Sequence, residues 1–160
     1  MSEFRGALQG AGLRFAVVVS RYNELVTERL LNGARACLLQ HGVAEGDVDV
    51  IYVPGAWELP GAALHAVQSG RYAAVVALGC VIRGETPHFD YVAGEASRGL
   101  AGVTMETGVP VGFGLLTTED PDQALARAGG KKGNKGWEAA LSALEMADLF
   151  RKLGGAHAGA

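Results

Sequence analysis

A histidine that closes a glycine-containing turn is the residue in this chain best suited to move protons. His88 lies in the stretch 79–91, GCVIRGETPHFDY, between an apolar run and a helical pattern. An imidazole titrates near physiological pH and can give or take a proton. At a helix N-terminus the dipole disfavours the imidazolium, which leaves a better proton acceptor. A surface or capping histidine is the ordinary alternative, and only the neighbouring residues weigh against it.

Those neighbours predict an anion site. Gly84 would let the backbone approach a ligand, and Glu85 and Thr86 precede a helix whose first N–H groups are unpaired. Arg83 adds a cation. The alternative is that Thr86 only caps the helix and Pro87 begins it. The stretch matches neither a Walker loop nor a dinucleotide fingerprint, so the motif alone is weak evidence for an anion site.

Strand and helix patterns alternate along the chain. Short runs rich in Val, Ile and Ala predict buried strands, and helical periods follow them, the first beginning at Asn23 as its N-cap. Strands are expected at 14–20, 47–53, 71–79 and 110–116, and helices at about 24–41, 56–69, 91–107, 120–128 and 135–148. This alternation predicts a three-layer α/β/α domain with a flavodoxin-like, four-stranded parallel sheet of order 2-1-3-4.

The chain ends and one internal segment complete the predicted organisation. Phe4 to Leu8 is expected to form a short edge strand within an N-terminal arm, residues 1–12, that pairs with another copy. Residues 129–136, GGKKGNKG, predict a flexible cationic linker, and residues 154–160 a disordered tail. With no internal repeat, residues 1–160 are expected to form a single domain.

Polar side chains gather in the turns that follow the strands, where open parallel sheets bind their ligands. Tyr22 could stack on a flat ring or simply cover the end of the core. Glu58 either complements the dipole of its helix or accepts hydrogen bonds from sugar-type hydroxyls, assisted by the N–H groups of Ala56 and Trp57. Arg127 suits bidentate contact with phosphate, although a solvated charge is the usual role of such a residue.

Composition excludes several classes of protein. The net charge is −3, and no basic block is longer than Lys131-Lys132, so a nucleic-acid surface has no electrostatic support. Cys37 and Cys80 lack metal-ligand spacing, which favours free thiols in a reducing cytosol. No apolar run approaches the roughly 20 residues that span a bilayer. We therefore expect a cytoplasmic protein without a metal or membrane contact.

Four segments together resemble the lumazine synthase family over nearly the whole chain, from about Arg14 to Leu153. They are RYNELVTERLLNGA, VPGAWELPGA, ALGCVIRGETPHFDYV and LLTTEDPDQALARAGGKKGNKGWEAALSALEMA. The resemblance implies condensation of 5-amino-6-(D-ribitylamino)uracil with 3,4-dihydroxy-2-butanone 4-phosphate to 6,7-dimethyl-8-ribityllumazine, with release of phosphate and water. It implies no cofactor.

The resemblance also assigns roles to residues. It implies proton transfer by His88 and stacking of the pyrimidine on Tyr22. The segments that it implies for binding are Ala56, Trp57 and Glu58 for the ribityl chain, Cys80, Val81 and Ile82 for the uracil edge, and Glu85 and Thr86 for the phosphate. Phe113 and Arg127 would come from a neighbouring subunit, with Arg127 on the phosphate, and Lys135 and Glu138 would be secondary polar groups.

Assembly follows from the resemblance too. The family builds pentamers, and some members join twelve pentamers into an icosahedral shell of 60 subunits, which the short linker before the last helix favours here. Riboflavin synthase is a candidate partner.

The chain departs from the family pattern at two positions. Tyr22 stands where Phe or Trp is more familiar, and Cys80 replaces a more usual aliphatic residue. The alternatives are a shell-forming or flavin-binding homologue with little catalysis and, from the fold alone, a flavodoxin-like phosphate-ligand or signalling module.

Overall fold

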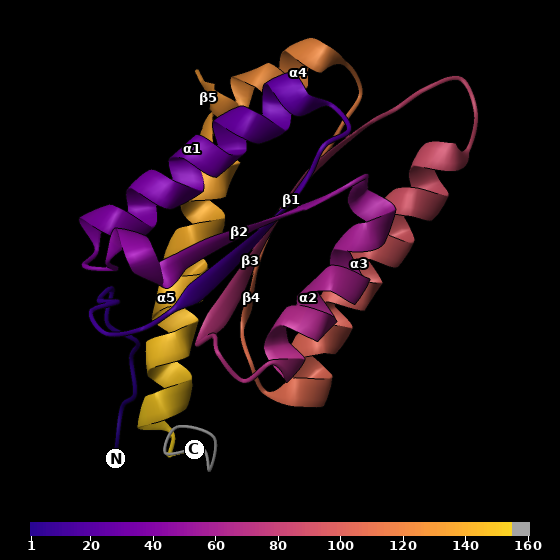
Figure 1. Ribbon diagram of the computed structural model, residues 1–160. Coiled ribbons are helices and arrows are strands. Elements are labelled where there is room, and N and C mark those ends of the chain that lie inside the picture. The colour runs from indigo at the N-terminus through magenta and orange to yellow at the C-terminus, as the bar shows by residue number, and fades with distance from the viewer. Residues whose placement is uncertain (155–160) are drawn as a thin grey trace.

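Four parallel strands form the centre of the molecule, and helices cover both faces (Figure 1). The computed structural model describes residues 1–154. The strands lie in the order β2-β1-β3-β4, as predicted. Their bounds are β1 Phe15–Ser20, β2 Val48–Val53, β3 Ala74–Ile82 and β4 Val111–Thr118. The helices are α1 Glu24–Gln40, α2 Leu59–Gln68, α3 His88–Thr107, α4 Pro121–Ala126 and α5 Lys135–Lys152, with short 3-10 turns η1 Glu45–Asp47 and η2 Ala56–Glu58.

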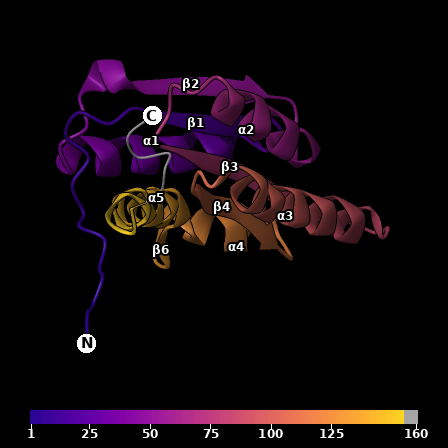
Figure 2. The same ribbon diagram turned by 90° about the horizontal axis from the view of Figure 1, so that it is seen from below.

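The central strand β1 shows why the chain folds this way. All six of its residues are buried, which is the pattern of a strand in a parallel sheet covered on both faces. Phe15 and Val17 pack with α1 and α5, whereas Ala16 and Val18 pack with α2 and α3. The alternating strand therefore serves two apolar cores, one on each side of the sheet (Figure 2).

Strand β3 is longer than the sequence predicts. It continues through Cys80 to Ile82, which the prediction placed in the following turn. The partner strand β4 also runs on, so the β3–β4 ladder reaches the pair Ile82 and Thr118. The β1–β3 ladder stops earlier, at Val19 and Leu78. The end of β3 thus has a strand on one edge only.

The predicted edge strand at Phe4 to Leu8 does not form within the single chain. The arm lies along α5 instead, where Ala7 N–H donates to Asp148 Oδ2 at 2.7 Å. Lys152 Nζ donates to the carbonyl of Arg5 at 2.9 Å. The backbone N–H and C=O groups within a helix are already paired, so they cannot bind the arm. Side chains at the end of α5 bind the polar groups of the arm instead.

The predicted flexible linker is wrong. Residues 128–134 form a small antiparallel hairpin from β5 Ala128–Gly130 and β6 Gly133–Asn134. Gly133 has φ 85°, a conformation that glycine adopts without steric cost, and it permits this turn. Asn134 then caps α5 as predicted, because its Oδ1 accepts from Trp137 N–H at 3.0 Å.

The tail predicted to be disordered lies, from residue 155 onward, outside the described residues. Within residues 1–154, every helix is too short or too polar to cross a bilayer.

Candidate active site

A pocket of about 330 Å³ opens at the carboxyl end of the sheet. It is lined by Tyr22, Gly55, Ala56, Trp57, Glu58, His88, Tyr91 and Val92. The turn after β1, the turn after β2 and the start of α3 all contribute to it. Five residues that the sequence singled out, separated by up to 66 positions, thus meet in one place.

Tyr22 is held against the turn that follows β2. Its N–H donates to the carbonyl of Pro54 at 2.9 Å, and Arg21 N–H donates to Val53 O at 2.8 Å. Tyr22 is 64% exposed, so its ring covers little of the core and is open to a ligand. Exposure favours the stacking role over the core-covering role.

Glu58 has a local partner as well as a place in the pocket. Its Oε1 accepts from Gly55 N–H at 2.9 Å, which closes a capping arrangement around η2. This contact is a capping role, which differs from the helix-dipole role that the sequence suggested. The carboxylate has a second oxygen, and Trp57 beside it is 57% exposed. The turn therefore offers a fixed carboxylate next to an open indole.

His88 is the first residue of α3, and the loop before it is exposed. Helix α3 begins at His88, with Pro87 in the N-cap position. Thr86 Oγ1 accepts from His88 N–H at 3.4 Å, which is the contact expected of the capping alternative, although at a long distance. The imidazole thus stands at the mouth of the pocket, directly after the proposed anion loop.

Arg83 is engaged within its own chain. Its Nε donates to Glu119 Oε2 at 2.7 Å, and its guanidinium lies 4.4 Å from the centre of the Phe89 ring. A weaker contact joins it to Asp90 Oδ1 at 3.4 Å. Arg83, the cation of this loop, is thus already paired. A phosphate bound here would need a positive charge from another residue.

Tyr91 is a pocket residue that the sequence prediction missed. It follows His88 by three positions on α3, and it is 69% exposed. Residues three apart on a helix share a face, so the helical period after His88 was the available signal. With Tyr22 and Trp57 it makes the pocket wall strongly aromatic.

Cys80, Val81 and Ile82 form the end of β3 rather than a loop. Cys80 is buried, and burial raises the pKa of its thiol to about 11. The thiol therefore stays protonated at neutral pH and is a poor nucleophile. Only the backbone of this segment is suited to ligand recognition.

Nine predicted site residues do not line this pocket: Cys80, Val81 and Ile82 on β3, Glu85 and Thr86 before α3, and Phe113, Arg127, Lys135 and Glu138 farther along the chain. Phe113 is 41% exposed on the edge strand β4, at the opposite side of the sheet from β2. Arg127 ends α4, and its Nη1 donates to Gln123 O at 3.1 Å. Lys135 begins α5, and Glu138 lies in its first turn. These four residues therefore belong to β4, α4 and α5, which contribute nothing to the lining of this pocket.

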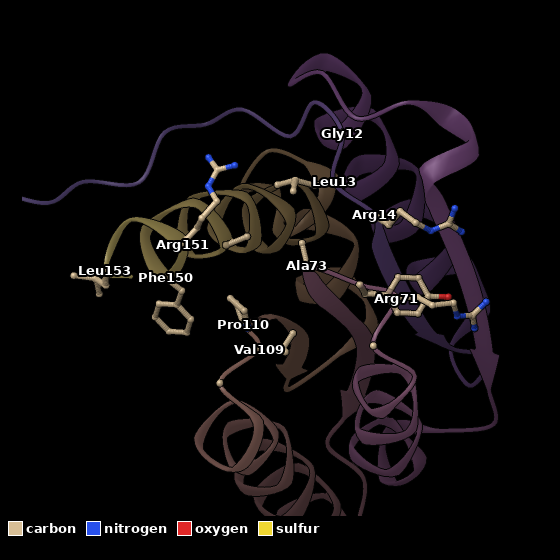
Figure 3. A pocket seen from close by; sticks show the side chains of 14 residues that line it. Gly12, Leu13, Arg14, Arg71, Ala73, Val109, Pro110, Phe150, Arg151 and Leu153 are labelled. Carbon is tan, nitrogen blue, oxygen red and sulfur yellow. The ribbon is translucent and has the colours of Figure 1, made fainter. Parts of the chain in front are cut away.

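A larger cavity of about 580 Å³ lies at the other end of the sheet (Figure 3). Its lining comes from residues just before β1, β3 and β4 and from the end of α5. Its arginines have local partners: Arg14 pairs with Asp49 at 3.1 Å, and Arg71 lies over the Tyr72 ring at 5.3 Å. Ligands of open parallel sheets bind at the carboxyl ends of the strands, so the smaller pocket is the better candidate.

Within residues 1–154, no group of three or more His, Cys, Asp or Glu side chains could hold a metal ion.

Comparison with known proteins shows the family of the chain. The sequence model of the family described as 6,7-dimethyl-8-ribityllumazine synthase matches residues 12–151. A 6,7-dimethyl-8-ribityllumazine synthase of Chlorobaculum tepidum is 50% identical over 153 residues, which are 96% of this chain and 99% of the relative. The match therefore includes the pocket, the hairpin and α5.

Proposed function

The chain belongs to the 6,7-dimethyl-8-ribityllumazine synthase family, and on this premise we propose how its residues divide the work of that reaction. It is a transferase that condenses 5-amino-6-(D-ribitylamino)uracil with 3,4-dihydroxy-2-butanone 4-phosphate. The products are 6,7-dimethyl-8-ribityllumazine, phosphate and water.

The observation that carries the assignment of roles is the meeting of Tyr22, Glu58 and His88 in one pocket. Tyr22 stacks on the pyrimidine, for which offset aromatic stacking contributes about 0.5–1.5 kcal/mol. Glu58, with Ala56 and Trp57, binds hydroxyls of the ribityl chain. The backbone of Cys80, Val81 and Ile82 binds the uracil edge.

His88 moves protons through the reaction. The amine of the pyrimidine attacks the ketone carbonyl, and water leaves as the imine forms. Phosphate departs next, and closure of the second ring releases a further water. Each step needs a proton given or taken near the imidazole, whereas alignment of the two substrates supplies much of the rate, up to about 7–11 kcal/mol in favourable cases.

The phosphate site is completed by a second subunit. Glu85 and Thr86 offer exposed backbone before α3, but Arg83 is already paired. Arg127 of a neighbouring subunit supplies the missing positive charge, Phe113 of that subunit closes the pocket, and Lys135 and Glu138 lie near the ketose. The support is that Phe113 is exposed on the edge strand β4, at the opposite side of the sheet from β2, and that Arg127 ends α4 outside the pocket lining.

Exposed apolar groups support an oligomer. Phe4 and Leu8 on the arm are 55% and 42% exposed, and Tyr52 on the edge strand β2 is 53% exposed. An unpaired edge strand is a template for a strand from another chain. We assign the pentamer to this chain, and its short hairpin favours the shell of twelve pentamers. Light scattering after sizing chromatography tests the shell, which a pentamer-only mass would exclude.

The decisive assay mixes the purified protein with both substrates and follows lumazine fluorescence. A rate above the uncatalysed reaction is expected, and a rate equal to it would favour a shell-forming or flavin-binding homologue with little catalysis.

The shared site has its own test, in which His88→Ala and Arg127→Ala subunits are unfolded, mixed and reassembled. If the two residues of one site come from different chains, about a quarter of the sites in equal mixtures regain both groups. No recovery in mixed oligomers would place both residues in one chain's site.

A further inference from the structure

Asn23 stands at the N-cap of α1 but does not cap it. Asparagine is favoured at this position because its side-chain oxygen usually accepts from the first unpaired N–H groups of the helix. Here the side chain makes no capping hydrogen bond. Its Nδ2 donates instead to the backbone carbonyl of Cys80 at 2.8 Å, across to the end of β3. The sequence prediction of an ordinary cap is therefore wrong.

The backbone of Asn23 is also unusual. With φ 63° and ψ 46°, it is the one residue other than glycine with a positive φ among residues 1–154. Asparagine tolerates this left-handed conformation better than most residues, but it still has a cost, which at functional sites is of order 1 kcal/mol. The conformation persists because the surrounding contacts hold it.

The acceptor lies where β3 has lost a neighbour. The β1–β3 ladder ends at Val19 and Leu78, so the next residues of β3 have no strand on that edge. The amide of Asn23 supplies the hydrogen bond that the ladder no longer provides at Cys80. Alternation along a strand places the N–H and C=O of Ile82 on the same edge as those of Cys80.

The turn that carries Asn23 is therefore fixed at two points. On one side, Tyr22 N–H donates to Pro54 O at 2.9 Å. On the other side, the Asn23 amide holds the end of β3. These two contacts set the separation between the exposed Tyr22 ring and the backbone edge that begins at Cys80.

We infer that Asn23 is a positioning residue for the pyrimidine substrate, because it fixes the stacking ring relative to the backbone edge that binds the same heterocycle. The inference rests on the proposed function, in which Tyr22 takes the face of the pyrimidine and the end of β3 takes its edge. A flat ring can satisfy both contacts only when they lie at one distance and angle, so a small displacement weakens binding.

Two substitutions separate this role from a structural one. Asn23→Gly removes the amide and accepts a positive φ without strain. Asn23→Asp keeps the shape and favours the helix dipole, but it sets an acceptor against the Cys80 carbonyl. Because the side chain does not cap α1, neither change removes a helix cap. Asn32→Asp, an exposed amide-to-acid change on the same helix, is the matched control.

The experiment measures kcat and the KM of each substrate, together with the melting temperature and oligomer mass. The expected result is a rise of about fivefold or more in the pyrimidine KM for both Asn23 variants. The ketose-phosphate KM of Asn23→Gly and all values for Asn32→Asp should stay at the wild-type level. Loss of stability with both KM values unchanged would overturn the inference, as would an equal rise in the two KM values. Lack of product from the wild-type protein would overturn the proposed function and this inference together.

Discussion

The ring of Tyr22 occupies the space where a side chain at position 55 would have to stand. A Cβ atom on Gly55 would lie 2.6 Å from Tyr22 Cδ2. The φ of Gly55 is −136°, which any residue can adopt, so glycine is needed here for space and not for conformation. The turn after β2 thus makes room for the aromatic side chain that follows β1.

Gly55→Ala should therefore displace the Tyr22 ring without straining the backbone. If the ring stacks on the pyrimidine, the KM of that substrate should rise about 2- to 10-fold as the stacking energy is lost. Gly61→Ala is the control, because nothing lies within 4 Å of a Cβ there. In α2 that change should leave KM alone and stabilise the fold by about 0.5–1 kcal/mol. An unchanged pyrimidine KM in Gly55→Ala would remove Tyr22 from the stacking role.

His88→Ala should slow turnover about 100-fold or more without abolishing it, because proton transfer is lost while alignment of the substrates remains. His65→Ala, which removes an exposed histidine from α2, should turn over like the wild-type protein. The measurement is kcat from lumazine fluorescence, with sizing chromatography to verify assembly. Complete loss of activity in an intact oligomer would contradict a role limited to proton transfer.

Arg127→Ala should act chiefly on the phosphate substrate. Loss of a charged hydrogen bond, about 1.5–3 kcal/mol, predicts a rise of about 10- to 100-fold in the KM of the ketose phosphate. Arg98→Ala is the control, because it removes a positive charge from an exposed arginine that lies beside Glu95 on α3. Equal ketose-phosphate KM values in the two variants would exclude Arg127 from the phosphate site.

Local patterns predicted most of the fold. The buried run of β1 and the side-chain caps at Asp120 and Asn134 depend on neighbours within a few residues, and the structure confirms them. The meeting of Tyr22 and His88 followed from one topological rule, that parallel strands end at a common edge.

Long-range contacts account for what could not be predicted. Asn23 has the sequence signature of a cap, but its acceptor is 57 residues away, so no local pattern indicates it. The end of β3 is a strand because β4 continues beside it. The arm binds α5 through Asp148, a residue that looked only like part of a helical period. The proposed placement of Phe113 and Arg127 beside a neighbour's His88 depends on an assembly that a single chain does not contain.

Asp148 joins the N-terminal arm to α5 through a charge that persists at low pH. The side chain is 2% exposed and accepts from the N–H of Ala7 and from Lys152 Nζ, and it also pairs with Arg151. The hydrogen bond from Ala7 and then that from Lys152 lower the pKa of this carboxyl from 3.8 to about 2. Because the folded pKa is depressed, the stabilisation is complete above about pH 4 and declines as the pH falls towards 2.

Asp148→Asn should therefore lower the free energy of unfolding at neutral pH by about 1–3 kcal/mol, since a charged acceptor is replaced by a neutral one. The difference from the wild-type protein should be the same at about pH 7 and pH 5 and smaller at about pH 3. Released from α5, the arm should also be cut faster by trypsin after Arg5. Glu145→Gln, an exposed carboxylate on the same helix, should change neither the unfolding free energy nor the cleavage rate. A stability difference that grows as the pH falls would show that the charge of Asp148 destabilises the folded chain, which is the opposite of the role assigned to it.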